Sequence, residues 1–233
     1  MFTQLVRRCS QATPALCEVC HAWPAGPVCG TCIAGFGAPR HRCLRCAIGL
    51  PEGVPVCGTC LRSPPPLDAC HAAVSYGYPW AGLIGRYKFS GEAGWAETFA
   101  ALAARAPAVA SLCAAAHRVV PMPLSRERLA QRGFNQAHEL ARRLAPAKAD
   151  PHLAVRLRDT PPQSALDLAA RRANVRNAFA LEPARAADVR GRAVLLVDDV
   201  MTTGASLFAL AGVFRAAGAS AVAAVVLART EEP

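Results

Sequence analysis

The hydrophobic positions fall into short apolar runs separated by longer mixed stretches. The short runs predict four strands, at residues 72–78, 118–122, 194–197 and 221–227. The mixed stretches predict helices, at residues 79–90, 94–106, 135–144 and 205–217. Because strands and helices alternate, we expect an α/β fold in which helices flank a mostly parallel sheet.

The run at residues 194–206, VLLVDDVMTTGAS, carries the most chemical information. Its apolar strand stops at two adjacent carboxylates, Asp198 and Asp199. A short turn with hydroxyl groups and a glycine follows, made of Thr202, Thr203, Gly204, Ala205 and Ser206. Ligands of open α/β sheets bind beyond the carboxyl ends of the strands, and a helix that starts there can hold a phosphate with its backbone N–H groups.

The acid pair before this turn suits the vicinal hydroxyls of a ribose, because ionised carboxylates only accept hydrogen bonds. The turn lacks the lysine of a Walker loop, so a sugar 5-phosphate fits better than a nucleoside triphosphate. An ordinary strand–turn–helix with capping Thr and Ser residues is the plainer alternative.

Eight of the 11 cysteines form four CxxC pairs within residues 17–60. The pairs are Cys17 and Cys20, Cys29 and Cys32, Cys43 and Cys46, and Cys57 and Cys60. Eight thiolates make two sites of four sulfurs, which favour structural Zn²⁺. The short intervals within each half favour sequential ribbons, and a cross-braced pairing stays open. The first 15 residues lack the apolar segment of a secretory signal, so disulfides are not expected.

The formal net charge is +10, and much of it lies between Arg118 and Arg192, where 15 basic residues face 7 acidic ones. Such a basic region favours phosphorylated ligands or nucleic acid. The alanine-rich stretch at residues 100–116 is broken by Arg105 and Pro107, which makes a membrane span unlikely on composition. These features predict a cytoplasmic protein without a membrane span.

Several motifs follow the cysteine pairs and the proline-rich linker at residues 63–66. In order, they are YKFSGE, VVPMPLSRERLAQRGFNQ, RDTPPQSALDLAARRANVRNAF and VLLVDDVMTTGAS. The last resembles the phosphoribosyl pyrophosphate (PRPP) loop of type I phosphoribosyltransferases. Together, the motifs from Cys17 to Arg229 resemble the ComF family of competence-associated, phosphoribosyltransferase-like proteins.

This resemblance implies a zinc-ribbon module at residues 1–62 and a domain of the type I phosphoribosyltransferase fold at residues 63–233. It also implies PRPP binding together with Mg²⁺, and a role in DNA uptake and natural transformation with single-stranded DNA and other uptake proteins as partners.

Carried over by residue, Asp198 and Asp199 would meet the ribose as catalytic acids, and residues 202–206 would hold the 5-phosphate. Arg126 and Arg132 would meet the pyrophosphate, and residues 150–176 would form a lid. If the chain is an enzyme, it displaces pyrophosphate at ribose C1, with an acceptor that stays open. No residue stands out as the general base, which leaves room for a non-catalytic role.

The competing hypotheses are a non-catalytic module that binds single-stranded nucleic acid and an adaptor that uses the zinc module for docking. In either case the PRPP site would be a sensor or a relic. Three aromatic residues interleaved with basic ones would suit the nucleic-acid hypothesis: Tyr87, Phe89 and Phe134. We also expect contributions from arginines in the polar segments, namely Arg126, Arg128, Arg132, Arg171, Arg172 and Arg176.

Overall fold

The computed structural model describes residues 15–23, 25–157 and 178–231. Contacts divide the chain into two compact units, Met1–Ala38 and Pro39–Pro233. The sequence predicts a boundary after residue 62, between the zinc-ribbon module and the phosphoribosyltransferase-like domain. A division by contacts does not test this boundary, which stays a prediction. Contacts place the division earlier because Cys43, Cys46 and Cys60 belong to the same buried cluster as the sheet. Residues 158–177, which include Arg171, Arg172, Arg176 and most of the expected lid, lie outside the described residues.

The smaller unit is built around the first four cysteines. An antiparallel bridge joins Ala15 to Ala25, and helix α1 (Gly30–Phe36) follows Cys29. Cys29 caps this helix, because its Sγ accepts a hydrogen bond from the backbone N–H of Cys32 at 3.4 Å. Among the residues of this unit that the structure describes, few are buried: Cys17, Val28 and Cys32.

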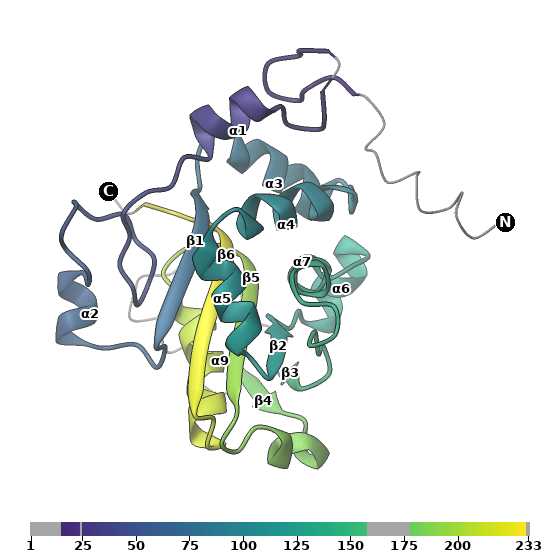
Figure 1. The fold of residues 1–233 in the computed structure, drawn as a ribbon. Coiled ribbons are helices and arrows are strands. Elements are labelled where there is room, and N and C mark those ends of the chain that lie inside the picture. The colour runs from purple at the N-terminus through teal and green to yellow at the C-terminus, as the bar shows by residue number, and fades with distance from the viewer. Residues whose placement is uncertain (1–14, 24, 158–177, 232–233) are drawn as a thin grey trace, which may run out of the picture. The chain divides into compact units, whose positions relative to one another are not determined.

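The larger unit contains a four-stranded parallel sheet (Figure 1). Its strands, in the spatial order β1-β6-β5-β2, are β1 (Ala69–Ser75), β6 (Ala221–Arg229), β5 (Ala193–Met201) and β2 (Arg118–Pro121). A separate antiparallel pair joins β3 (Ala154–Arg156) to β4 (Phe179–Leu181). The predicted parallel α/β sheet is therefore confirmed.

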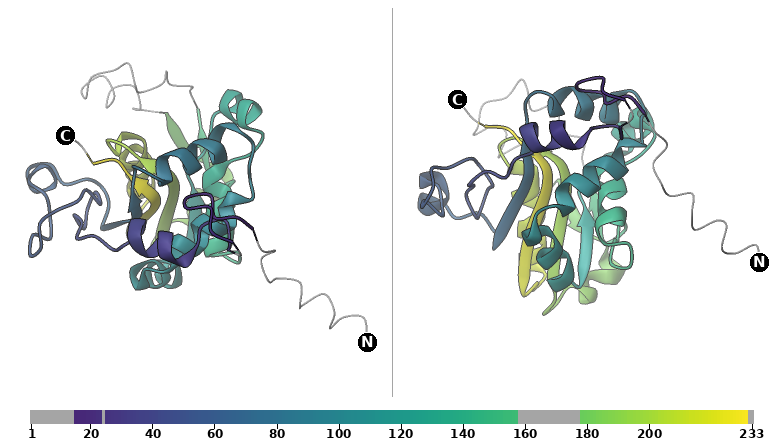
Figure 2. Two further views of the ribbon diagram at one scale, coloured as in Figure 1. Left: turned by 90° about the horizontal axis from the view of Figure 1, so that it is seen from above. Right: turned by 45° about the horizontal axis from the view of Figure 1, so that its top comes forward.

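Helices cover both faces of this sheet, as Figure 1 and Figure 2 show. One face packs against α4 (Trp95–Ala104), α5 (Pro107–Ala115) and α7 (Gln136–Leu144), and the other against α9 (Ala205–Ala216). The other helices in the described part of the chain are α2 (Gly58–Arg62), α3 (Trp80–Phe89), α6 (Arg126–Arg132) and the 3-10 helix η3 (Pro183–Asp188).

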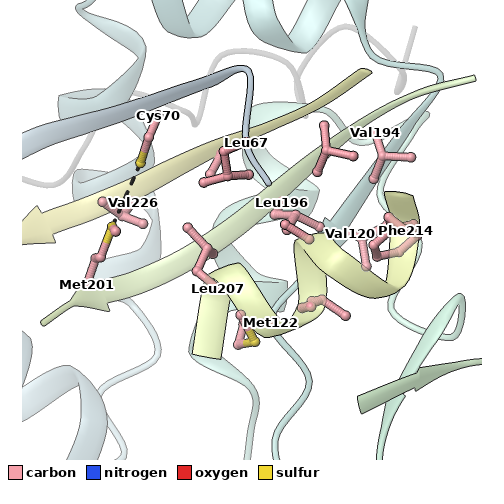
Figure 3. Packing of buried hydrophobic residues seen from close by; sticks show 14 of the residues in the cluster. Leu67, Cys70, Val120, Met122, Val194, Leu196, Met201, Leu207, Phe214 and Val226 are labelled. Carbon is pink, nitrogen blue, oxygen red and sulfur yellow. Dashed lines mark hydrogen bonds between the residues drawn. The ribbon is translucent and has the colours of Figure 1, made fainter. Parts of the chain in front are cut away.

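The face under α9 holds the main hydrophobic cluster (Figure 3). Side chains alternate along a strand, so Val194 and Leu196 of β5 point into this cluster together with Leu207 and Phe214 of α9. The buried Cys70 of β1 extends the cluster and donates its S–H to Met201 at 3.8 Å. The second group of cysteines packs into the same cluster, so it shares the core of the sheet.

Two local elements differ from expectation. The segment after β2, which lies between the predicted strand at residues 118–122 and the predicted helix at residues 135–144, contains helix α6. Ser125 caps it by accepting from the N–H of Arg128 at 3.3 Å, and Gly133 ends it with a φ of 78°. Strand β5 continues past the acid pair to Met201, because its residues keep pairing with β6.

Within the described ranges, no single helix is long and apolar enough to cross a bilayer. Helices α4 and α5 pass the length and composition test only as a pair, and they are bent by 96° at their break.

Candidate functional site

The acid pair and the turn that follows it line one cavity of about 440 Å³ at the carboxyl end of β5. Asp198 and Asp199 stand on the last part of the strand, which the pairing of Asp198 with Val226 on β6 holds in place. Residues from five further segments contribute to the wall: Lys88 and Phe89 at the end of α3, Met122 and Leu124 after β2, Arg128 and Arg132 of α6, Asn135 and Gln136 at the start of α7, and Arg156 of β3.

At one position of the turn between β5 and α9, the backbone conformation requires glycine. Gly204 has a φ of 81°, which is the left-handed region. A Cβ added there would lie 2.7 Å from the Phe208 ring and also against the Met201 methyl group. Thr203 accepts a hydrogen bond from the N–H of Ala205 at 3.3 Å, so its hydroxyl shapes the turn. The start of α9 is thereby presented to the cavity.

Not every residue of the turn reaches this cavity. Thr202, Gly204, Ala205 and Ser206 line it, whereas Thr203 lines a second cavity on the other side of the turn. The first turn of α9 directs backbone N–H groups and the positive end of its dipole toward the acids' cavity. An anionic group of phosphate size is the ligand that such a turn can hold.

Lys88 is a site residue that sequence reasoning did not assign. Its Nζ lies 2.9 Å from Oδ1 of Asp199, and both side chains are largely buried, with 17% and 10% of their surface exposed. Tyr87 is buried, and it donates its hydroxyl to the Gln136 carbonyl at 2.9 Å, which fixes the end of α3 against α7. The quoted motif YKFSGE contained this lysine, but only the fold brings it to the acids.

The two acids have different surroundings. Burial and the neighbouring Asp199 charge raise the pKa of Asp198 to about 7, although Lys88 and Arg132 act in the opposite direction. The backbone N–H of Asp199 donates to Asp198 at 2.8 Å, and the N–H of Val200 donates to Asp199 at 2.6 Å. Near neutral pH the pair therefore holds less than its full two negative charges, and a hydrogen-bonding or cationic ligand would favour its ionised form.

The predicted arginines do not share one position. Arg132 lines the cavity and donates to the Gln136 side chain at 3.1 Å, with its guanidinium 5.4 Å from the ring centroid of Phe89. Arg126 is exposed at the start of α6 and is not among the residues that line the cavity. Residues four apart on a helix share a face, so Arg128, not Arg126, accompanies Arg132 in the wall.

The aromatic residues also separate. Phe89 is 76% exposed, whereas Tyr87 is fully buried and packs edge-on against Phe99 at 5.4 Å. Phe134 is partly buried and lies 5.4 Å from the Tyr87 ring. Of the three aromatics expected to contact nucleic acid, Phe89 is the one that lines the cavity.

The cysteines form two separate tetrads in sequential order, which decides between the two pairings that spacing left open. The first tetrad is Cys17, Cys20, Cys29 and Cys32, and the second is Cys43, Cys46, Cys57 and Cys60. Within each, the four sulfurs lie within 4.8 Å of one another. The sulfur atoms of Cys20 and Cys29 are 3.6 Å apart, and those of Cys46 and Cys57 are 3.7 Å apart.

These separations fit a tetrahedral zinc centre, in which Zn–S bonds of about 2.3 Å place sulfurs about 3.8 Å apart. Backbone N–H groups also point at the sulfurs: Cys29 donates to Cys17, and Cys57 donates to Cys43, each at 3.3 Å. Both tetrads are therefore compatible with zinc bound by four sulfurs.

Comparison with known proteins agrees with this architecture. The model of the phosphoribosyl transferase domain family matches residues 129–233, which include the acid pair and the turn. "DNA utilization protein YhgH" of Escherichia coli K12 is 31% identical over 229 residues, covering 93% of this chain and 98% of the relative. "Competence protein F" of Haemophilus influenzae is 32% identical over 193 residues, covering 80% of this chain and 84% of the relative.

The chain belongs to the ComF family. In this ComF-family protein, the phosphoribosyltransferase-like sheet carries the cavity, and the two N-terminal cysteine tetrads fit zinc ribbons. A further relative, the YhgH protein of Salmonella typhi, is 33% identical over 226 residues and also spans 93% of this chain.

Proposed function

We propose that this protein binds PRPP with Mg²⁺ in the cavity at the end of β5, and that it handles incoming single-stranded DNA in the cytoplasm during DNA uptake. The observation that carries the PRPP assignment is that the acid pair shares one cavity with the turn before α9 and with three arginines, Arg128, Arg132 and Arg156. The names of the two relatives, which refer to DNA utilization and competence, support the cellular role.

The residues would divide the ligand between them. The turn at residues 202–206 would hold the 5-phosphate with N–H groups and hydroxyls. Asp198 and Asp199 would accept hydrogen bonds from the ribose hydroxyls, and Lys88 would hold the Asp199 carboxylate in place across their 2.9 Å contact. Arg132, together with Arg128, would face the pyrophosphate. Arg126, which is exposed outside the cavity, would contribute only through its charge.

A transfer reaction at this site would break the bond between ribose C1 and the pyrophosphate oxygen. Positive charge then develops on the ribose ring, beside the two acids, while negative charge develops on the leaving group, beside Arg132. When bound, Mg²⁺ would neutralise part of the pyrophosphate charge. The acceptor that attacks C1 decides which transfer reaction the protein would catalyse, and activity assays with candidate acceptors identify it.

The binding proposal is tested by calorimetry with PRPP and Mg²⁺. We expect the double variant Asp198→Asn and Asp199→Asn to lose PRPP binding while keeping its fold. Asp188→Asn is the matched control, because Asp188 pairs with Arg185 on η3 and does not line the cavity. Unchanged PRPP affinity in the double variant would show that the acids do not contact the ribose.

The pKa of Asp198 adds a second readout to this experiment. Its protonated form accepts fewer hydrogen bonds, so PRPP affinity should fall as the pH is lowered through about 7. Because PRPP itself titrates, the single variant Asp198→Asn reports the ligand's own pH dependence. The difference between the two profiles belongs to Asp198, and parallel profiles would contradict its role.

Single-stranded DNA binding is the second candidate, and the exposed ring of Phe89 favours it. This ring lines the cavity beneath the Arg132 guanidinium, an arrangement on which a base could stack. We expect Phe89→Ala to weaken binding of an oligothymidylate, and PRPP to compete with that oligonucleotide. Equal affinity of Phe89→Ala and the parent would remove Phe89 from the DNA surface.

A further inference from the structure

Arg229 is a buried cation at the last position of β6. Only 3% of its surface is exposed, and its hydrogen bonds go to oxygen atoms of neutral groups. Among the ion pairs of the described residues, none includes Arg229. A buried guanidinium without a counter-charge is costly, so its position requires an explanation.

The guanidinium of Arg229 joins the second tetrad to the turn at residues 202–206. Its Nε donates to the backbone carbonyl of Cys46 at 3.0 Å. Its Nη1 donates to the carbonyl of Thr202, and a weaker contact of 3.4 Å reaches the carbonyl of Met201. Because the guanidinium is planar and rigid, a shift of the Cys46 carbonyl changes where the Thr202 carbonyl can be held.

The second tetrad also supplies the missing charge. Four cysteine thiolates around one Zn²⁺ carry a net charge of about −2. Arg229 lies directly against this cluster through Cys46, so the bound metal centre would serve as its counter-ion. The same guanidinium then fixes the entrance to the phosphate turn, three residues before the start of α9.

We propose that Arg229 is a positioning residue that couples metal binding at the second tetrad to ligand binding at the phosphate turn. The metal fixes the Cys46 carbonyl, Arg229 transmits that position, and the turn is held in the conformation that receives a phosphate. This coupling rests on the proposed function for its ligand. Coupling between two sites is reciprocal, so PRPP must raise the zinc affinity of the second tetrad by the factor by which zinc raises PRPP affinity.

A second contact between the same regions provides a matched control. Glu231 accepts from the Gly49 N–H at 2.9 Å and pairs with Arg42 at 2.9 Å, so it also ties the segment around the second tetrad to the end of β6. The hydrogen bonds of Glu231 come from Arg42, Gly49 and Ser75, and none comes from the turn at residues 202–206. Glu231→Gln therefore loosens the tetrad region without touching the proposed connection.

The experiment measures zinc affinity by chelator competition, with and without PRPP and Mg²⁺, in the full-length chain carrying Cys20→Ser. This substitution removes a ligand from the first tetrad, so the signal comes from the second. We expect PRPP to raise zinc affinity about tenfold, a typical size for coupling between sites. Arg229→Lys, which keeps the charge but lacks the planar fork, should lose this effect, and Glu231→Gln should keep it.

The comparison of zinc affinity with and without PRPP needs no variant of Arg229, so a folding defect of such a variant cannot obscure it. If PRPP binds but leaves zinc affinity unchanged, the coupling is wrong although the proposed function stands. If PRPP does not bind at all, the proposed function fails and hydrogen exchange decides the coupling. Amides at residues 202–206 should then exchange faster in Arg229→Lys than in Glu231→Gln, and equal rates would overturn the connection.

Discussion

The two cysteine tetrads have the same local chemistry and different surroundings. In each, the backbone N–H of the third cysteine donates to the sulfur of the first at 3.3 Å. The helix after the third cysteine also begins in the same way, with that cysteine as its N-cap. Local sequence therefore suffices to set the ligand geometry in both places.

The tetrads differ at their second cysteine and in what packs against them, although Cys17 is buried as fully as Cys43. Cys20 of the first tetrad is exposed, and the described apolar residues around it include Trp23, which is 64% exposed. In the second tetrad, Cys43 is fully buried and belongs to the main hydrophobic cluster of the sheet, as do Cys46 and Cys60. The comparison indicates that one motif can form a self-contained metal module or part of a larger core, depending on what packs against it.

The largest expected difference follows from removing a ligand from each tetrad. Cys43→Ser should destabilise the larger unit by about 3 kcal/mol or more, because it disrupts both the metal centre and the core. Cys17→Ser should unfold the described part of the smaller unit and leave the larger one within about 1 kcal/mol of the parent. Urea unfolding, with hydrogen exchange resolved by peptide, measures both effects.

Equal losses in the two variants would contradict the comparison, because the tetrads would then depend on the sheet to the same degree. Zinc analysis of the parent should give about two ions per chain, and each variant should lose about one. Loss of both ions from either variant would show that the tetrads are coupled to each other.

Apolar side chains near each tetrad should show the next largest effect. Leu67 is fully buried in the cluster that contains the second tetrad, so Leu67→Ala should cost about 2–5 kcal/mol. Trp23→Ala should change the unfolding of the larger unit by less than about 0.5 kcal/mol, since its side chain is mostly exposed. A small loss for Leu67→Ala, measured by urea unfolding, would mean that this part of the core repacks.

The sequence predicted the features that depend on neighbours along the chain. The spacing of the CxxC pairs predicted two groups of four cysteines, and the run from Val194 to Ser206 predicted strand, acids, turn and helix in order. The turn at Gly204 has the backbone that its glycine suggests. These features follow from local geometry, which a sequence pattern records.

Contacts between distant segments could not be predicted in the same way. The pairing of Lys88 with Asp199 and the position of Arg229 depend on how strands and helices meet in space. The expectation for Arg126 came from the resemblance to the family; because its segment forms helix α6, residue spacing places Arg128 and Arg132 together in the cavity wall. The basic residues after β2 indicated an anion site in the sequence, but only their helical spacing shows which of them share a face.

A smaller effect is expected from the hydrogen bonds that hold the second tetrad. Arg45 donates to the carbonyl of Leu67 at 2.5 Å, which ties the segment between Cys43 and Cys46 to the start of β1. Arg45→Met should cost about 1.5 kcal/mol, because it removes a charge-assisted hydrogen bond and leaves the carbonyl less well satisfied. Arg40→Met, at an exposed position before the tetrad, is the control in the same urea experiment. Equal stability of the two variants would show that this bond contributes little.

The smallest expected effect is a pH dependence that only the second tetrad should show. Burial opposes the ionisation of Glu231, but the N–H of Gly49, a hydroxyl group and the Arg42 guanidinium outweigh it and lower the pKa of Glu231. A lowered folded-state pKa stabilises the fold above the unfolded value of 4.5, and this contribution is lost as the pH falls through the folded value. About a third of the Glu231 side chain is exposed, so solvent screening limits the contribution to about 0.5–1 kcal/mol.

Glu231→Gln should therefore lower the unfolding free energy of the larger unit at pH 7, and its difference from the parent should disappear as the pH falls through the lowered pKa of Glu231. Hydrogen exchange of residues 42–49 should rise with the loss, while exchange of residues 15–23 should not change. A difference between parent and variant that persists undiminished at low pH would mean that Glu231 acts through packing, and the second tetrad would then owe its place to the core rather than to this ion pair.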